Sequence, residues 1–138
     1  MSDEFDRLVT RESCDDTART VQRLLASLDR RNLRLFSLID HAAVAATVGL
    51  ELPPTQVIAF GSPQVGTPLM QVAPTLAIDL PLRILVREDE SGRARLYHFP
   101  AELLGQRHRL DERSTPALRK MSQSLCTIVA DAAGLEAV

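Results

Sequence analysis

The pattern of hydrophobic and polar positions in the first quarter of the chain predicts a strand followed by a helix. Apolar and charged residues alternate over residues 4–13, which is typical of a half-exposed strand. Over residues 13–32 the apolar spacing becomes helical, and Ser13 and Asp16 have the spacing of an N-terminal cap. Asn32 suits the left-handed conformation that ends a helix.

The next segment repeats this order with shorter elements. Residues 33–39 form a compact apolar run that predicts a second strand. An Ala-rich helix is expected over residues 41–48, with Asp40 as its cap and Gly49 as its end. Residues 55–60 are apolar almost throughout and predict a third, central strand.

The stretch "AFGSPQVGTPLM" allows two different helix starts. Ser62 can cap a helix whose first residue is Pro63, or Thr67 can cap one that begins at Pro68. Both cannot be ideal, because a proline inside a helix removes an internal hydrogen bond. We therefore expect a kinked or late-starting helix.

The second half of the chain predicts a hairpin and two helices. Residues 76–89 and 94–99 alternate around a short polar turn, as antiparallel strands do. Pro100 is expected to begin a short helix, and the charged residues 106–114 read as a loop. A last helix over about residues 115–133 starts with Thr-Pro, a common opening pair.

This order, β-α-β-α-β-α-β-β-α-α, predicts an α+β fold. We expect residues 1–138 to form a single layered domain, with a mostly antiparallel sheet of about five strands and helices packed on one face. The other face is then open to solvent or covered by a partner.

Composition narrows the range of partners and cofactors. The 16 basic and 18 acidic residues give a net charge of −2, and the basic ones are scattered, so nucleic acid is not an expected partner. No apolar run reaches the roughly 18 residues of a membrane span, and the acidic start does not resemble a signal peptide. We expect a cytoplasmic protein without membrane contact. Cys14, Cys126 and the three histidines have no metal-ligand spacing, so neither a metal nor a cofactor is expected.

Three polar residues are candidates for a site. Asp40 most simply caps the following helix, whereas His41, at the start of that helix, is equally well a proton donor or acceptor and a plain surface residue. Arg83 lies in an apolar strand and needs a carboxylate, water or an acidic ligand as its partner.

The turn after the third predicted strand supplies a second group of candidates. A helix start presents free backbone N–H groups, and nearby hydroxyls can add donors for an anion or a carboxylate. The stretch matches no known phosphate-binding loop, so it is either a ligand cradle or a structural turn. The candidate residues are Gly61, Ser62, Gly66 and Thr67.

The remaining polar residues receive simpler interpretations. Asp79 is expected to accept a hydrogen bond in a turn, His98 to be exposed on its strand, and His108 to be solvated in a loop. The single Tyr and the absence of Trp leave no aromatic platform for stacking bases.

The run from Asp40 to Arg83 resembles domain of unknown function 302, a family of small bacterial and archaeal domains. The resemblance covers about residues 20–105, and it implies a small α+β domain, a homodimer and no established catalytic role. One departure is "ARLYHFP", where related chains often carry an Asn-Asp or similar pair before the proline, which puts any ligand contact of that pair in doubt. The matching positions are Asp40-His41-Ala42, Pro54-Thr55, Phe60-Gly61, Pro63, Gly66 to Met70, Pro74 and Asp79 to Arg83.

Three hypotheses for the function follow. The first is a homodimeric binding or accessory domain in which His41, the turn 61–67 and Arg83 converge on a pocket for a small polar or anionic ligand. The second is an enzyme with His41 as general acid or base and Arg83 as electrostatic stabiliser, although no nucleophile or metal set accompanies them. The third is a structural or protein-interaction domain without a ligand.

Overall fold

The computed structural model describes residues 7–134, and its element order confirms the predicted α+β fold. Within these residues the strands form one antiparallel sheet in the order β1-β5-β4-β3-β2. The strands are β1 (Val9–Glu12), β2 (Arg34–Asp40), β3 (Thr55–Gly61), β4 (Leu82–Glu88) and β5 (Ala94–His98). The α-helices are α1 (Thr17–Arg30), α2 (His41–Ala46), α3 (Pro63–Val72), α4 (Glu102–Arg107) and α5 (Thr115–Ala133). Two 3-10 turns, η2 (Pro74–Ile78) and η3 (Glu112–Ser114), complete the order, while residues 4–6 of the first predicted strand lie outside the described residues.

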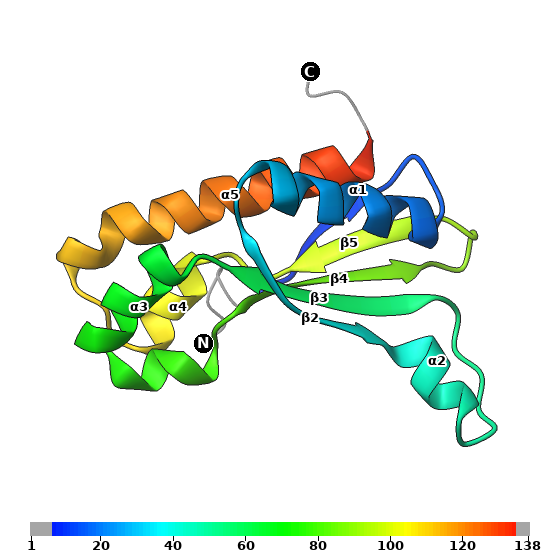
Figure 1. Ribbon diagram of the computed structural model, residues 1–138, viewed down its shortest axis with the longest axis horizontal. Helices are drawn as coiled ribbons and strands as arrows, with labels where there is room; N and C mark the ends of the chain where they lie inside the picture. Colours follow the sequence, from blue (N-terminus) through cyan, green and yellow to red (C-terminus); the bar gives the residue numbers. More distant parts are fainter. Residues whose placement is uncertain (1–6, 135–138) are drawn as a thin grey trace.

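The long helices cover one face of the sheet, as expected. Figure 1 shows α1 and α5 side by side across that face, with α3 and α4 at one end of the molecule. The core forms where their apolar stripes meet alternate residues of the central strands. Its fully buried side chains include Leu24, Ile58, Phe60, Ile84, Leu96, Leu125 and Ile128.

Helix α1 starts later than the sequence indicates. Asp16, not Ser13, is its cap, and the Asp16 carboxylate accepts a hydrogen bond of 2.8 Å from the backbone N–H of Arg19. Ser13 is instead fully buried and shares a hydrogen bond of 2.6 Å with the Thr20 hydroxyl. Asn32 follows the helix in the predicted left-handed conformation, with φ of 55°.

A carboxylate near the end of α5 connects this helix to α1. Asp131 accepts hydrogen bonds from the Ser27 hydroxyl at 2.7 Å and from the Arg31 guanidinium at 2.9 Å. The Ser27 hydrogen bond, followed by the contact with Arg31, lowers the pKa of Asp131. The two covering helices are therefore held together by polar contacts as well as by the core.

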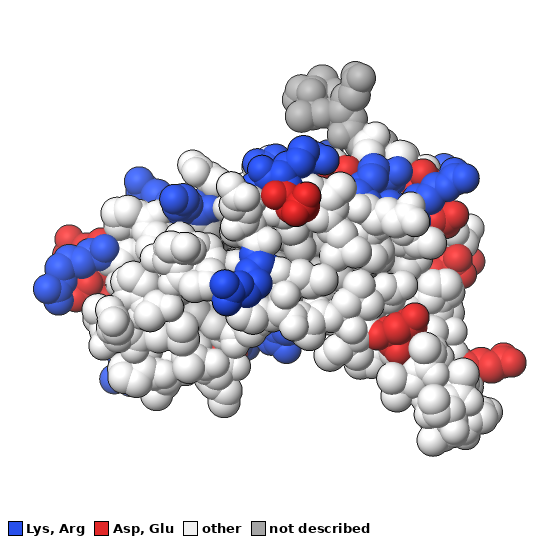
Figure 2. Space-filling view, viewed as in Figure 1, with Lys and Arg blue, Asp and Glu red and all other residues white. Residues whose placement is uncertain are grey.

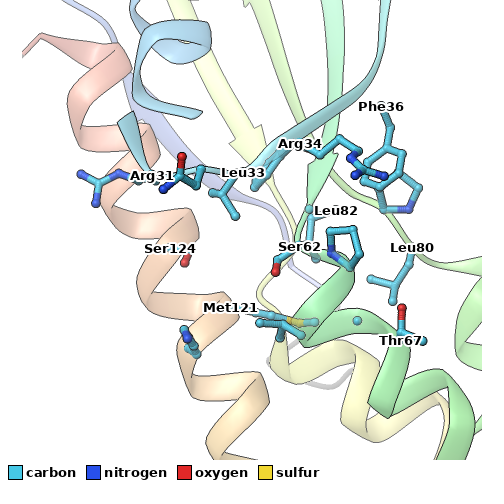
Figure 3. Close-up of a pocket in the computed structure, with 18 of the residues that line it drawn as sticks. Arg31, Leu33, Arg34, Phe36, Ser62, Thr67, Leu80, Leu82, Met121 and Ser124 are labelled. Atoms are coloured by element: carbon cyan, nitrogen blue, oxygen red, sulfur yellow. The ribbon is translucent and has the colours of Figure 1, made fainter. Parts of the chain in front are cut away.

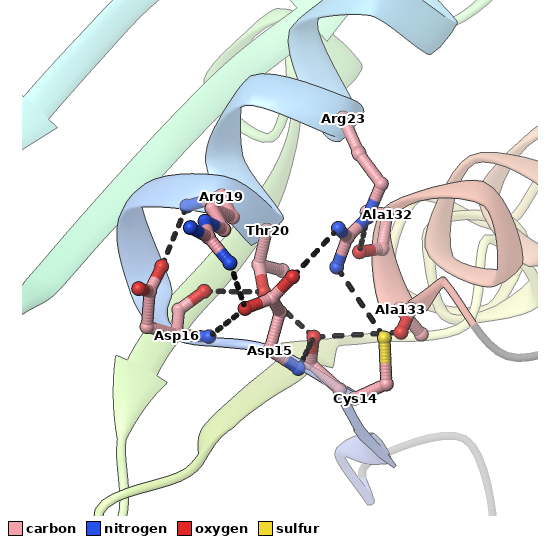
Figure 4. A network of polar contacts seen from close by, with 9 residues as sticks. Cys14, Asp15, Asp16, Arg19, Thr20, Arg23, Ala132 and Ala133 are labelled. Atoms are coloured by element: carbon pink, nitrogen blue, oxygen red, sulfur yellow. Dashed lines mark hydrogen bonds and ion pairs between the residues drawn. The ribbon is translucent and has the colours of Figure 1, made fainter.

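A second polar network anchors the end of β1 to both helices (Figure 4). The Cys14 backbone N–H donates to the Ala133 carbonyl at 2.9 Å, which joins the strand end to α5. The Arg23 guanidinium donates to the Ala132 carbonyl at 3.0 Å and to the Asp15 carboxylate at 3.1 Å. One α1 side chain thus holds the turn after β1 and the end of α5 in place.

Strand β4 is shorter than the predicted run of residues 76–89. It begins at Leu82, after the turn η2 and the cis peptide bond before Pro81. Proline has no N–H group for the ladder, so regular pairing starts only beyond it. Within the strand the predicted alternation holds, with Ile84 buried and Arg83 exposed.

Helix α2 and the residues after it project beyond the end of the sheet (Figure 1, Figure 2). Together with the edge strand β2 they form residues 34–52, which we call the β2–α2 arm. Asp40 caps α2 as predicted, accepting a hydrogen bond of 3.0 Å from the Ala43 backbone N–H. None of the α2 residues is buried. The large apolar residues exposed along the arm are Leu35, Phe36, Leu38, Ile39, Val44, Val48, Leu50 and Leu52.

Candidate functional site

A cavity lies at the end of the sheet away from the arm's helix. It has a volume of about 550 Å³ and is bounded by the start of β2, the β3–α3 turn, the start of β4 and one side of α5 (Figure 3). This volume falls within the range of roughly 300–1,000 Å³ that is typical of small-molecule sites.

The β3–α3 turn adopts the earlier of the two predicted helix starts. Ser62 is the cap residue and Pro63 the first residue of α3, so the late start is not observed. The Ser62 hydroxyl donates to the Gln64 side-chain oxygen at 3.2 Å instead of capping a backbone N–H. Pro68 lies inside the helix and removes one internal hydrogen bond without ending it.

Four of the predicted site residues come together at this cavity. Gly61 ends β3, Ser62 forms the turn, and Gly66 and Thr67 belong to the first part of α3. All four line the cavity, so the chain presents the turn to an open space. Figure 3 shows Ser62 and Thr67 on the α3 side of this space.

Most of the cavity wall is apolar. Figure 3 shows Leu33, just before β2, and Met121 from α5 on opposite sides of the space. The cavity lies over the core, because Phe60 at its base is only 1% exposed. The larger apolar side chains in its wall are Leu33, Phe36, Phe60, Val65, Met70, Leu80, Leu82 and Met121.

The charged residues in the cavity wall are all basic. They are Arg31, Arg34 and Lys120, and no Asp or Glu is among the described residues that line the space. Arg31 is already paired with Asp131 at 2.9 Å. Arg34 lies over the Phe36 ring at 6.0 Å from its centroid. In residues 7–134 neither Arg34 nor Lys120 forms an ion pair, so both charges are available to an anion.

The other predicted site residues lie elsewhere. Asp40 and His41 are at the opposite end of β2, where Asp40 caps α2 and His41 is exposed. Arg83 is on β4, paired with Ala59, and its side chain is exposed on the sheet face that α1 and α5 do not cover. The expected convergence of His41, Thr67 and Arg83 is therefore not observed, which removes the geometric basis for a reaction that uses His41 and Arg83 together.

Arg83 instead borders a smaller cavity of about 240 Å³. Leu8, Tyr97 and Phe99 also line this cavity, together with Asp79. The Tyr97 hydroxyl accepts a hydrogen bond of 3.1 Å from Arg87. The two cavities share only Leu82, so they are separate candidates and the larger one has the stronger ligand-site geometry.

His98 is buried, which corrects the expectation of an exposed strand residue. It is 6% exposed and follows Ala94 and Leu96 at every second position, on the helix-covered face. Burial lowers the pKa of His98, against the opposing effect of its hydrogen bond with the Phe99 carbonyl. The alternation of side chains along β5 places His98 on the same face as Ala94 and Leu96, so the sequence pattern could have predicted its burial.

His108 is also not solvated, because the segment predicted as a loop contains the end of α4 and the turn η3. Its Nε2 lies 2.7 Å from the Asp79 carboxylate and its Nδ1 lies 2.9 Å from the Thr75 hydroxyl. Asp79, expected to accept a bond in a local turn, accepts bonds from His108 and Arg107 instead. These contacts connect the turn η2 with the end of α4.

The described residues contain neither a cluster of metal ligands nor a membrane-spanning helix. Among residues 7–134 there is no group of three or more His, Cys, Asp or Glu side chains arranged to hold a metal ion. No helix in this part of the chain has the length and apolarity needed to cross a membrane.

Sequence reasoning missed the side of the cavity that α5 and β2 provide. Lys120, Met121 and Ser124 come from α5, and Phe36 comes from β2, far from the turn in sequence. The apolar spacing along residues 115–133 marked Met121 as inward-facing, but no local pattern marks Lys120 as part of a cavity. Tertiary packing alone brings these residues to the turn.

These features define a class of domain: an antiparallel α+β sheet covered on one face by two helices, with a basic-rimmed apolar cavity beside the β3–α3 turn. The chain belongs to the family "Domain of unknown function DUF302", whose family model matches residues 9–128. This match extends beyond residues 20–105 at both ends.

A solved structure has the same fold. It is the crystal structure of an uncharacterized conserved DUF302 protein from Bacillus stearothermophilus, with a TM-score of 0.79. The similarity covers 91% of this chain and 97% of that one at 16% sequence identity. At this identity the comparison supports the fold.

Curated relatives are found in three species of Brucella. The protein "Fluoride-specific ion channel FluC 1" of Brucella suis biovar 1 (strain 1330) is 42% identical over 127 residues, which is 92% of this chain and 50% of the relative. The FluC 1 protein of Brucella abortus and the FluC 2 protein of Brucella melitensis match equally well over 47% of their lengths. The chain thus spans about half the length of the curated relatives it matches.

Proposed function

We propose that this domain is a homodimeric binding module for a small polar or anionic ligand, which it holds in the cavity beside the β3–α3 turn. The observation that supports this proposal is the cavity of about 550 Å³ lined by Gly61, Ser62, Gly66 and Thr67. A well-formed cavity with a few polar groups is the usual geometry of a ligand site. The two thiols, Cys14 and Cys126, are free, which fits a function in the reducing cytoplasm.

Native mass spectrometry tests ligand binding directly. The unsubstituted chain, isolated gently from the cells that express it, should retain a small molecule of defined mass. Ser124→Phe places an aromatic ring in the cavity and should remove this mass. Gln123→Phe adds the same ring at the neighbouring exposed position and should leave it. If all three proteins retain the same small molecule, or if none retains one, the proposal is contradicted.

The β2–α2 arm supports the homodimer. Eight large apolar side chains of the arm are 39% to 71% exposed, and they lie on both faces of β2 and along the residues after it. A stable interface buries ~800 Å² on each partner. α2 has only six residues and no buried side chain, whereas short helices need packing for their stability. An apolar surface of this extent is typical of an interaction site.

A second copy of the chain fits this surface because β2 is an edge strand. An identical strand can pair with its free backbone groups in an isologous arrangement. Arg34 opens β2 and Asp40 closes it, so antiparallel pairing brings opposite charges to the same end. Parallel pairing would place like charges together.

Sedimentation velocity over a range of protein concentrations tests the dimer. The unsubstituted chain should sediment as a dimer, and Ile39→Lys on β2 should produce a monomer because it places a charge within the apolar surface. Ile78→Lys is the matched control, since Ile78 is 83% exposed but lies outside the arm. If the unsubstituted chain sediments as a monomer, the homodimer is contradicted and the arm is available to a different partner.

The curated relatives suggest a wider setting for the module. We propose that the domain is accessory to a membrane ion channel, because the chain matches half of proteins named fluoride-specific ion channels. Fluoride flux through the Brucella suis relative in liposomes, measured with and without its matching half, tests this. Unchanged flux and unchanged regulation would contradict an accessory role.

Fluoride itself does not suit the cavity. A small, strongly hydrated anion loses its water in an apolar space, and this cavity has the volume of a much larger molecule. The ligand of the module is therefore expected to differ from the ion that names the relatives. Sodium fluoride and sodium chloride should shift the melting temperature of the chain equally.

A further inference from the structure

The distribution of charge and apolar surface in the cavity identifies a class of ligand. We infer that the cavity binds a single-chain amphipathic anion: a molecule with an apolar body of several carbons and one carboxylate or phosphate group. This inference rests on the proposed function and adds the chemistry of the ligand to it.

The apolar wall requires an apolar body. Residues from β2, β3, α3, β4 and α5 enclose the space, and most of them present hydrocarbon or thioether groups. Leu33 and Met121 lie on opposite sides, so a chain between them contacts apolar atoms on both sides (Figure 3). Each buried CH₂ group contributes about 0.8 kcal/mol to transfer from water. A compact polar ligand would leave this surface unused.

The charges at the cavity require a negative head group. Lys120 has no carboxylate partner in the described residues, and the Arg34 guanidinium contacts only the face of Phe36 there. Arg31 shares the Asp131 carboxylate with Arg30. Because no acidic side chain lines the space, an anion meets attraction without a compensating repulsion.

Hydroxyl groups complete the polar part of the wall. Thr67 on α3 and Ser124 on α5 have no hydrogen-bond partner within residues 7–134, and both line the cavity. Ser62 contributes a third hydroxyl beside the start of α3. The Thr67 and Ser124 hydroxyls can donate to the oxygens of a carboxylate or phosphate, whereas the Ser62 hydroxyl already donates to Gln64. A hydrocarbon alone would leave the Thr67 and Ser124 donors unused.

A set of three probes separates the contributions of the head group and the body. Octanoate carries both, 1-octanol has the body without the charge, and acetate has the charge without the body. Isothermal titration calorimetry at low ionic strength, below the concentration at which octanoate forms micelles, should show octanoate binding at least ten-fold more tightly than either of the others. Octyl phosphate in place of octanoate distinguishes a phosphate head from a carboxylate head.

Substitutions locate the binding in the cavity. Lys120→Met and Arg34→Met keep an unbranched side chain and remove its charge. Each should weaken the affinity for octanoate about five- to ten-fold without changing the affinity for 1-octanol. Arg119→Met removes a neighbouring exposed charge on α5 that does not line the cavity and should have no effect. Ser124→Phe should abolish binding of both eight-carbon probes.

The outcomes separate this inference from the proposed function. Equal affinities for octanoate and 1-octanol, or for octanoate and acetate, would overturn the inference that the ligand is an amphipathic anion. The proposed binding function would still stand if native mass spectrometry shows a ligand whose retention depends on the cavity. Octanoate binding that Ser124→Phe does not change also overturns the inference, because the probe then binds outside the cavity. No cavity-dependent binding in either experiment contradicts both proposals.

Discussion

The two edge strands of the sheet are finished in different ways. β1 has four residues, and the turn that follows it is fixed to α1 and α5 by Ser13, Cys14 and Asp15. β2 has seven residues and leads into α2, in which no residue is buried. Polar contacts with the covering helices therefore hold the end of β1 in place. The β2 edge instead carries a large apolar surface that is exposed to water.

The two edges differ in how they are protected from pairing with another chain. Edge strands expose unpaired backbone groups, and proteins protect such edges by keeping them short or by covering them. The β1 strand is short, and a dense network fixes the turn that follows it (Figure 4). The β2 strand has neither kind of protection, which agrees with the proposed homodimer. Matched substitutions at the two edges test the comparison.

The largest difference is expected between two leucines. Leu24 on α1 is fully buried, so Leu24→Ala should lower the free energy of unfolding by about 2–5 kcal/mol at any protein concentration. Leu50 in the arm is 65% exposed, so Leu50→Ala should change the stability of the dilute chain by less than about 0.5 kcal/mol. Urea unfolding at two protein concentrations measures both values. An equally large loss for Leu50→Ala in the dilute chain would mean that the arm packs within its own subunit.

Two glycines with positive φ give the next difference. Gly134 after α5 has φ of 68°, and an added Cβ would lie 2.7 Å from the Cys14 sulfur. Gly49 in the arm has φ of 76° with nothing within 4 Å of such an atom. Gly49→Ala should cost about 1 kcal/mol from backbone strain alone, and Gly134→Ala about 2 kcal/mol because the overlap adds to the strain. Thermal unfolding measures the difference between the two variants. Equal losses of stability would show that Cys14 can move away from an added Cβ at Gly134 at little cost.

Local patterns in the sequence predicted most of the fold. Periodicity and caps identify α1, α2 and α5, because their apolar stripes and their Asp40 and Asn32 signals act within a few residues. The start of α1 was misplaced because Ser13 and Asp16 both suit a cap, and only the buried contact of Ser13 with Thr20 distinguishes them. The tertiary structure decides between such alternatives.

The sequence predicts only one part of the candidate site, the turn after β3. The turn from Gly61 to Thr67 stood out through its Gly, Ser and Pro residues, which have strong local preferences. His41 and Arg83 were expected nearby because both lie at or within strands, but the β2 strand carries His41 to its far end. Lys120 and Ser124 lie more than 50 residues beyond the turn, and only the packing of α5 brings them to it.

Two arginines provide a smaller difference between the edges. Arg23→Ala leaves the Ala132 carbonyl without its side-chain donor and should lower the free energy of unfolding by about 1 kcal/mol. Arg34→Ala on β2 removes a charge whose contact in the described residues is the Phe36 ring, and it should change stability by less than about 0.5 kcal/mol. Chemical unfolding of both variants measures this, and a larger loss for Arg34→Ala would reverse the comparison.

The smallest difference concerns two histidines and appears only as a dependence on pH. Burial holds the pKa of His98 below its ordinary value of about 6.5, so the unfolded chain binds the proton more readily than the folded one. Its contribution is complete above about pH 6.5 and is lost as the pH falls from there toward the lower folded-state pKa. His98→Gln should therefore flatten the fall in unfolding free energy between pH 7.5 and pH 5. His41→Gln, which removes an exposed imidazole in the arm, is the matched control. Urea unfolding across this range measures both slopes. An unchanged slope in His98→Gln would mean that water reaches the helix-covered face beside β1.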